Sequence, residues 1–132
     1  MSKATIDAMN WLRDQMIAED VVGTSELVLA EALNNIIEHA YEFKETAEIS
    51  VAAQIDDQSI CFRLTDWGKK FPGIPQKKEM KGNEVAFDDL PEGGFGWFLI
   101  HELTTKISYL RDADSNLLFL FIDKNANSSS AA

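Results

Sequence analysis

Apolar residues in the first part of the chain recur every three or four positions, which predicts an amphipathic helix from Ser2 to about Glu19. Ser2 is placed to cap the start of this helix, because its hydroxyl can accept a hydrogen bond from a first-turn amide. Gly23 is expected to break the helical pattern, since glycine lowers helix stability. The apolar positions of the predicted helix are Ile6, Met9, Leu12 and Met16.

A second helix is expected to begin at Thr24 or Ser25, either of which can cap it, and to run to about Phe43. Its apolar face consists of Leu29, Leu33, Ile36, Ile37 and Ala40. The roughly opposite face is a polar stripe of Glu31, Asn35, Glu38 and Glu42. We therefore expect the apolar face to pack on a hydrophobic core and the polar face to lie in polar surroundings.

Apolar and polar residues alternate in segments 49–55 and 60–65, which predicts two antiparallel strands joined by a turn at Asp56-Asp57. A short helix is expected at about 96–103, followed by strands at 105–111 and 117–123 with a turn through 112–116. Together these elements predict a two-layer α/β sandwich. Its sheet is antiparallel or mixed, with helices on one face.

Two segments lack a regular pattern. Residues 68–93 hold all three prolines, and a segment of this length is typically a lid, a binding loop or disordered. Residues 125–132 are rich in Asn, Ser and Ala and are expected to form a disordered tail. We therefore expect one domain, at 1–124, and a tail, at 125–132.

The overall charge narrows the range of partners. Twelve basic and twenty-two acidic side chains give a formal net charge of −10, which disfavours binding to nucleic acid or to an anionic membrane. The start of the chain has no apolar signal region, and no apolar run is long enough to span a bilayer, so a cytoplasmic location is expected. Cys61, the only cysteine, is expected to be a small buried apolar residue.

Three common site motifs fail on this sequence. The phosphate-binding pattern GxxxxGK[ST] does not occur. Gly94-Phe95-Gly96 begins like a dinucleotide fingerprint, but Leu99 stands where the third glycine belongs. His101-Glu102 begins like a zinc-protease motif, but Thr105 replaces the second histidine. Walker-type, Rossmann and zinc-protease sites are therefore excluded.

The first candidate pair is Glu31 and Asn35 on the second predicted helix. Their spacing of four places both side chains on one helical face, with Cβ atoms about 5–6 Å apart. Magnesium prefers oxygen ligands and often takes only one or two protein groups beside phosphate oxygens. The pair can therefore serve a magnesium site, although a solvated polar stripe would give the same pattern.

Two further segments carry candidate chemistry. Asp66 ends a predicted strand, where its carboxylate can accept a hydrogen bond from an exocyclic amine, and Gly68 permits a ligand close to the backbone. The run Gly93-Gly94-Phe95-Gly96-Trp97 leads into a helix whose free amides can bind phosphate. The alternatives are an ordinary turn at Asp66 and a flexible hinge at the glycines.

In this order the three segments resemble the boxes of the histidine-kinase-like (GHKL, Bergerat-type) ATPase superfamily, and more narrowly its anti-sigma-factor serine/threonine-protein kinases. The resemblance covers residues 26–122. It implies that Glu31 activates the attacking hydroxyl, Asn35 holds Mg²⁺, and Asp66 bonds the adenine amine of ATP. It also implies that Gly68 lies against the base. Five residues are assigned to the phosphate box: Gly93, Gly94, Phe95, Gly96 and Trp97.

The same resemblance implies the partners. The substrate would be a serine or threonine of a small anti-anti-sigma protein, and the competing partner would be a sigma factor. A homodimer stays open. Two alternatives also stay open: a noncatalytic ATP-dependent switch that sequesters a regulator, and an ATPase domain related to the sensor histidine kinases.

Overall fold

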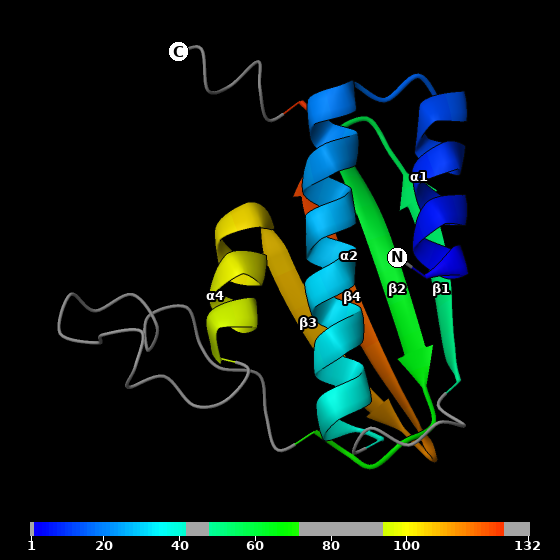
Figure 1. The fold of residues 1–132 in the computed structure, drawn as a ribbon, viewed down its shortest axis with the longest axis vertical. Helices are drawn as coiled ribbons and strands as arrows, with labels where there is room; N and C mark the ends of the chain where they lie inside the picture. Colours follow the sequence, from blue (N-terminus) through cyan, green and yellow to red (C-terminus); the bar gives the residue numbers. More distant parts are fainter. Residues whose placement is uncertain (1, 42–47, 72–93, 126–132) are drawn as a thin grey trace, which may run out of the picture.

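The protein is a two-layer α/β sandwich, in which helices cover one face of a four-stranded sheet (Figure 1). The computed structural model describes residues 2–41, 48–71 and 94–125. The helices are α1 (Lys3–Asp14), α2 (Glu19–His39) and α4 (Gly94–Leu103). The strands are β1 (Ile49–Ile55), β2 (Ser59–Asp66), β3 (Lys106–Asp112) and β4 (Ser115–Asp123).

The sheet has the strand order β1-β2-β4-β3, and every described pair is antiparallel. The pattern of apolar and polar residues in the sequence predicted these four strands, and the structure confirms them to within two residues at each end. The turn between β3 and β4 contains Ala113, whose positive φ of 53° gives the left-handed conformation of a tight hairpin. The predicted sandwich is thus confirmed, with an antiparallel sheet.

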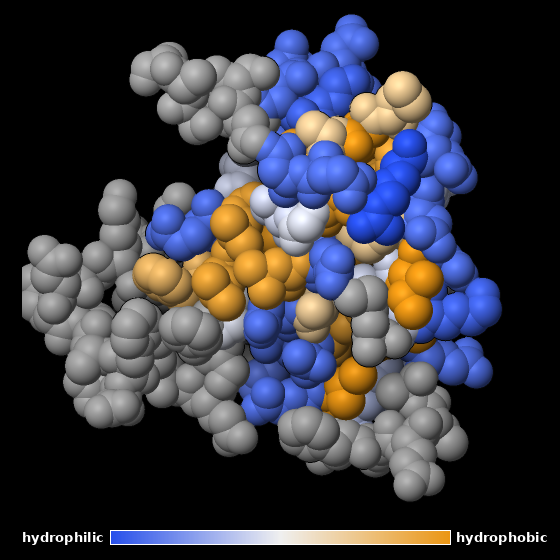
Figure 2. Space-filling view, turned by 45° about the horizontal axis from the view of Figure 1, so that its top comes forward, coloured by the Kyte–Doolittle hydropathy of each residue, from blue (hydrophilic) through white to orange (hydrophobic). Residues whose placement is uncertain are grey.

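The hydrophobic core lies between the helices and the sheet. Leu29 and Ile36 of α2, Ile100 of α4, Phe62 of β2 and Leu120 of β4 are all 0% exposed. Burying a side chain of this kind stabilises the fold by about 1.5–3 kcal/mol. Figure 2 shows that hydrophobic residues also reach the surface in a patch on the side that carries the helices, with hydrophilic residues around it.

The prediction that Gly23 breaks the helical pattern is wrong, because α2 begins at Glu19 and runs through Gly23. The chain turns earlier, at Met16, whose φ is 64°. Thr24 and Ser25 do not cap a helix; their hydroxyls donate to carbonyls one turn back, those of Asp20 and Val21. A glycine within a helix costs about 1 kcal/mol relative to alanine, which the buried Val21 and its neighbours in α2 outweigh.

Cys61 is half-buried, not buried, and lies on the face of the sheet away from the helices. Its neighbours Ile60 and Phe62 point into the core instead. Partial burial raises the pKa of the Cys61 thiol, so the thiol stays protonated at neutral pH. The raised pKa agrees with the expectation that this cysteine is unreactive. The expectation that it is buried in the core is wrong.

Some expectations fall outside the described residues. They concern residues 72–93 of the irregular segment, which was expected to be a lid, a binding loop or disordered, and residues 126–132 of the predicted tail. Among the described helices, none is long and apolar enough to cross a membrane.

Candidate functional site

Glu31 and Asn35 lie one turn apart on α2, and both face the first turn of α4. A Cβ atom added to Gly96 would lie 2.8 Å from Glu31 Oε2 and 3.4 Å from Asn35 Oδ1. Both side chains therefore reach the backbone of Gly96 itself. Only glycine at position 96 leaves room for the Glu31 carboxylate and the Asn35 amide where they lie.

Asn35 is 3% exposed, although it belongs to the polar face of α2. Its Nδ2 is the one buried side-chain nitrogen or oxygen in the described part of the chain that has no hydrogen-bond partner. Leaving a buried polar group unpaired costs about 1–3 kcal/mol, so natural proteins rarely retain one without a purpose. The alternative of a solvated polar stripe is therefore wrong at Asn35.

α4 begins at Gly94, two residues earlier than the sequence pattern predicted. Its first turn includes Gly94, Phe95 and Gly96, and the N–H groups of a first turn have no partner within the helix. Such N–H groups, together with the positive end of the helix dipole, bind phosphate oxygens. Trp97 is 4% exposed, so its side chain belongs to the core. Gly93 lies outside the described residues.

Asp66 occupies the end of β2 and is 1% exposed. Its Oδ1 accepts hydrogen bonds from Gly68 N, at 2.9 Å, and from Asn116 Nδ2, at 2.8 Å. Both bonds use the same oxygen, and neither uses Oδ2. The carboxylate is therefore held in one orientation through Oδ1, and no residue that the structure describes donates to its Oδ2.

A glycine is required at position 68 because the backbone there lies against the end of α2. A Cβ atom at this position would lie 2.7 Å from the carbonyl carbon of Ala40, and closer still to its oxygen. The same carbonyl accepts a hydrogen bond from Lys69 N at 2.9 Å. Tyr41 also connects the end of α2 to the turn after β2. Its hydroxyl accepts a hydrogen bond from Trp67 N at 2.8 Å and donates one to the Glu48 carbonyl at 2.6 Å.

Sequence reasoning missed Asn116, which is 1% exposed and bonds several parts of the site. Besides Asp66, its Nδ2 donates to the carbonyls of Gly68 and Lys69. Its Oδ1 accepts from Tyr109 Oη and from Arg111 Nη1. Asn116 therefore fixes both the carboxylate and the turn that follows it.

An aromatic cluster joins the two halves of the site. Phe71 is 4% exposed, and its ring centroid lies 6.3 Å from those of His39 and Trp97 and 5.5 Å from that of Tyr109. His39 follows Asn35 by one turn of α2, and Trp97 follows Gly96 in α4. Since Tyr109 bonds Asn116, Phe71 contacts both the α2–α4 half and the Asp66 half.

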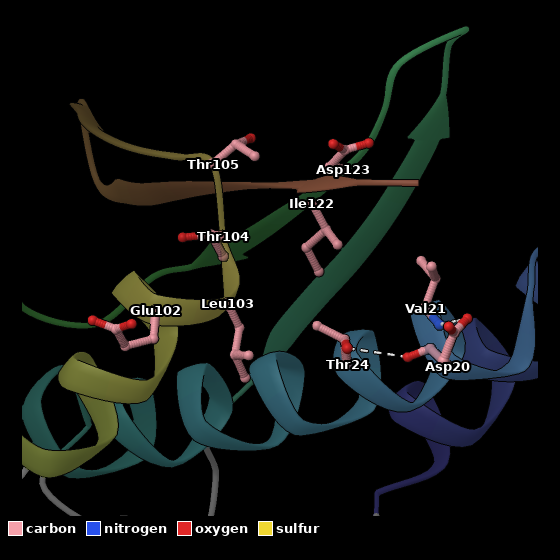
Figure 3. Close-up of a pocket in the computed structure, with 9 residues that line it drawn as sticks. All are labelled: Asp20, Val21, Thr24, Glu102, Leu103, Thr104, Thr105, Ile122 and Asp123. Carbon is pink, nitrogen blue, oxygen red and sulfur yellow. Dashed lines mark hydrogen bonds between the residues drawn. The ribbon is translucent and has the colours of Figure 1, made fainter. Parts of the chain in front are cut away.

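A pocket of about 280 Å³ lies at another place in the molecule. Figure 3 shows the residues that line it. None of the residues that line it was predicted from the sequence to belong to a site. Asp20, Glu102 and Asp123 lie around it, and three carboxylates disfavour a phosphate ligand. The residues with the geometry for a nucleotide are thus those around Asn35, Gly96 and Asp66.

Comparisons with known proteins agree with this geometry. The family model described as histidine kinase-like ATPase domain matches residues 1–121. The chain is 34% identical over 80 residues to the serine-protein kinase RsbW of Oceanobacillus iheyensis, covering 59% of this chain and 51% of that protein. It is 30% identical over 97 residues to the serine-protein kinase RsbW of Staphylococcus epidermidis, covering 71% and 61%.

A solved structure shares the fold. The Acinetobacter baumannii histidine kinase AdeS superposes with a TM-score of 0.50 and 18% identity, over 79% of this chain and 47% of that one. The chain spans about half to three fifths of the length of the curated relatives described above.

Proposed function

Since the chain belongs to the histidine kinase-like ATPase family, we propose that it binds Mg-ATP between α2, α4 and the turn at Asp66. We further propose that it transfers the γ-phosphate to a serine or threonine of a small anti-anti-sigma protein and sequesters a sigma factor in the cytoplasm. The name serine-protein kinase carried by its relatives supports this reaction.

One observation carries the proposal: the buried Asn35 Nδ2 without a partner lies at the backbone of Gly96, next to the Glu31 carboxylate. A phosphate oxygen at this position would accept from Nδ2 and from the first-turn amides of α4. The unpaired donor is therefore accounted for by an anionic ligand.

Magnesium fits the same donor set only if the nucleotide brings most of the ligands. In the described part of the chain, no group of three or more His, Cys, Asp or Glu residues could hold a metal ion. Asn35 Oδ1 would be the protein ligand, with phosphate oxygens and water completing the set. Bound magnesium would neutralise charge on the phosphates during transfer.

Glu31 is proposed as the base. The substrate hydroxyl oxygen would form a bond to the γ-phosphorus while the bond from that phosphorus to the bridging oxygen breaks, and ADP leaves. The hydroxyl proton would pass to the Glu31 carboxylate. Because phosphoryl transfer needs mainly alignment and charge neutralisation, one oriented base and a set of fixed donors suffice.

Asp66 is proposed to bind the base of the nucleotide, with Oδ2 accepting from the adenine amine while protein donors occupy Oδ1. Gly68 would line the base as backbone. Gly93, Gly94, Phe95, Gly96 and Trp97 would bind phosphates through their backbone, since the Trp97 side chain packs in the core.

Two measurements on the full chain test the proposal. Calorimetry with millimolar ATP and Mg²⁺ should give a binding isotherm, and γ-labelled ATP should label an anti-anti-sigma protein. The Glu31→Gln variant should still bind ATP but lose at least about a hundredfold in transfer rate. Absence of binding to the unaltered chain would end the proposal; binding without transfer would instead support the noncatalytic switch.

A further inference from the structure

β4 carries apolar side chains on both faces of the sheet. Those that point towards the helices are at most 2% exposed: Leu118, Leu120 and Ile122. Because neighbouring side chains of a strand alternate, Leu117, Phe119 and Phe121 point to the other face. A strand that is apolar throughout is typical of a sheet covered on both faces. The described helices cover only one face (Figure 1).

The face of the sheet away from the helices, called the open face below, carries side chains in three rows that the strand register fixes. From β1 to β3, the first row is Gln54, Cys61, Phe121 and Lys106; the second is Ala52, Arg63, Phe119 and Ser108; the third is Ser50, Thr65, Leu117 and Leu110. The three large apolar side chains of β4 therefore form a ridge between β2 and β3. Leu110 extends the apolar surface at one end and is 54% exposed.

The open face is positively charged, although the chain has a net charge of −10. Its three rows hold Arg63 and Lys106 and no carboxylate. Neither cation forms an ion pair with a residue that the structure describes. Lys106 Nζ lies 5.5 Å from the centroid of the Phe121 ring, and Arg63 is exposed opposite Phe119. The two cations thus flank the ridge, one from β2 and the other from β3.

Backbone hydrogen bonding decides which kind of element can lie on the open face. The N–H and C=O groups of strands point along the sheet, so the face offers no backbone partners. A segment that covers it must satisfy its own backbone groups, as an α-helix does and a single extended strand does not. We propose that the open face binds an amphipathic helix of a partner protein, with the apolar stripe of the helix on the ridge and carboxylates on both borders of that stripe.

The dimensions of the open face suit such a helix. Leu117 to Phe121 spans four positions, about 13 Å, which matches about nine residues of an α-helix. Strands lie about 4.8 Å apart and a helix is about 10 Å wide, so Arg63 and Lys106 lie beneath its two borders. A hollow of about 140 Å³ beside the ridge, lined by residues of β1 together with Cys61, Arg63 and Phe119, offers space for one apolar side chain of the helix.

Synthetic peptides test the proposal on the full chain. The probe is a helix of about 18 residues of Ala, Leu and Glu, with Leu at i, i+3, i+4 and i+7 and Glu on both borders; the matched peptide has Lys in place of every Glu. Fluorescence anisotropy at about 50 mM salt should show micromolar binding of the Glu peptide and at least about tenfold weaker binding of the Lys peptide. The net charge of the protein favours the opposite order, so the expected order reports the local cations. Equal or tighter binding of the Lys peptide, or no binding of the Glu peptide, overturns the proposal.

Variants locate the bound peptide. Leu110 on the open face and Leu27 on α2 are both exposed leucines, at 54% and 41%. Leu110→Ser should weaken binding of the Glu peptide at least about threefold, and Leu27→Ser, the matched control, should leave it unchanged. Arg63→Gln combined with Lys106→Gln should remove the difference between the two peptides. All four side chains are exposed, so the fold should be retained. Equal effects of the two leucine variants overturn the proposal.

Cys61 gives an independent readout, because it is the only cysteine of the chain and lies opposite Phe121 on the open face. At about pH 9, saturating Glu peptide should slow the reaction of its thiol with a thiol reagent at least about fivefold. An unchanged rate overturns the proposal, as does protection by phosphatidylserine vesicles and not by the peptide. Protection that grows with the concentration of the free chain overturns it in favour of a second copy. None of these measurements uses nucleotide, so their outcome is independent of the proposed function.

Discussion

Asp66 and Asn116 lie directly opposite each other in the β2–β4 ladder, and Asn116 Nδ2 donates to Asp66 Oδ1 at 2.8 Å. Both side chains are 1% exposed. A buried carboxylate that receives a directed hydrogen bond is fixed in orientation, and the fixed orientation decides which ligand groups its other oxygen can accept from. The pair therefore links the strand register to the proposed selection of the nucleotide base.

Asn116→Ala should weaken ATP binding about tenfold, because Asp66 Oδ1 loses one of its two donors and the carboxylate can rotate. The affinity for a nucleotide without the exocyclic amine, such as ITP, should fall less than the affinity for ATP. The variant should therefore discriminate less between ATP and ITP. Calorimetric titration with both nucleotides measures this. Ser115→Ala is the matched control, since the Ser115 hydroxyl bonds only within the same exposed hairpin. Unchanged discrimination in Asn116→Ala would contradict the role given to Asn116.

Asn35→Leu should separate stability from ligand binding. Replacing the buried, unpaired amide by an apolar side chain of similar size should raise the free energy of unfolding of the ligand-free chain by about 1–3 kcal/mol. The same variant should lose the thermal stabilisation that saturating Mg-ATP gives, because bound ligand stabilises only through its affinity for the native state. Thermal unfolding with and without 5 mM Mg-ATP measures both effects. A variant that is less stable without ligand would show that the amide has an intramolecular partner.

The strands and the Glu31–Asn35 pair could be predicted because their signals are local. Alternation of apolar and polar residues in 49–55 directly reflects the two faces of a strand. A spacing of four on a helix places Glu31 and Asn35 together whatever the rest of the chain does. What the spacing could not supply is the depth of Asn35, since its burial depends on the approach of α4 at Gly96.

The helix boundary at Gly23 and the role of Asn116 were missed because both depend on contacts distant in sequence. Gly23 is a local helix breaker by propensity, but the burial of Val21 and Val22 in the core decides where α2 begins. Asn116 stands next to a hairpin turn, where asparagine is common. Only the pairing of β2 with β4 brings it to Asp66, fifty residues earlier.

Gly96→Ala should affect function more than stability. Alanine favours a helix interior over glycine by up to about 1 kcal/mol. The new Cβ would lie 2.8 Å from Glu31 Oε2, and that carboxylate can move away because it ends a flexible side chain. The unfolding temperature should therefore change little, while ATP affinity or transfer falls at least about fivefold. Equal activity of the variant and the unaltered chain would show that the position of Glu31 is unimportant.

Gly68→Ala should act in the opposite way, by destabilising the fold itself. The neighbouring atoms here are the carbonyl of Ala40 at the end of α2, which is backbone and cannot move without disturbing the helix. Overpacking of this kind costs about 1–3 kcal/mol. Urea unfolding should show a lower midpoint with an unchanged slope.

Gly23→Ala is the matched control for Gly68→Ala, because both replace glycine by alanine and only the surroundings differ. Nothing lies within 4 Å of a Cβ at Gly23, which is exposed within α2. Alanine should therefore stabilise the chain by about 0.5–1 kcal/mol through its helix propensity. Opposite signs for the two variants are expected. If Gly68→Ala were also stabilising, the turn after β2 would not be packed on Ala40, and Asp66 would lose part of the support that fixes it.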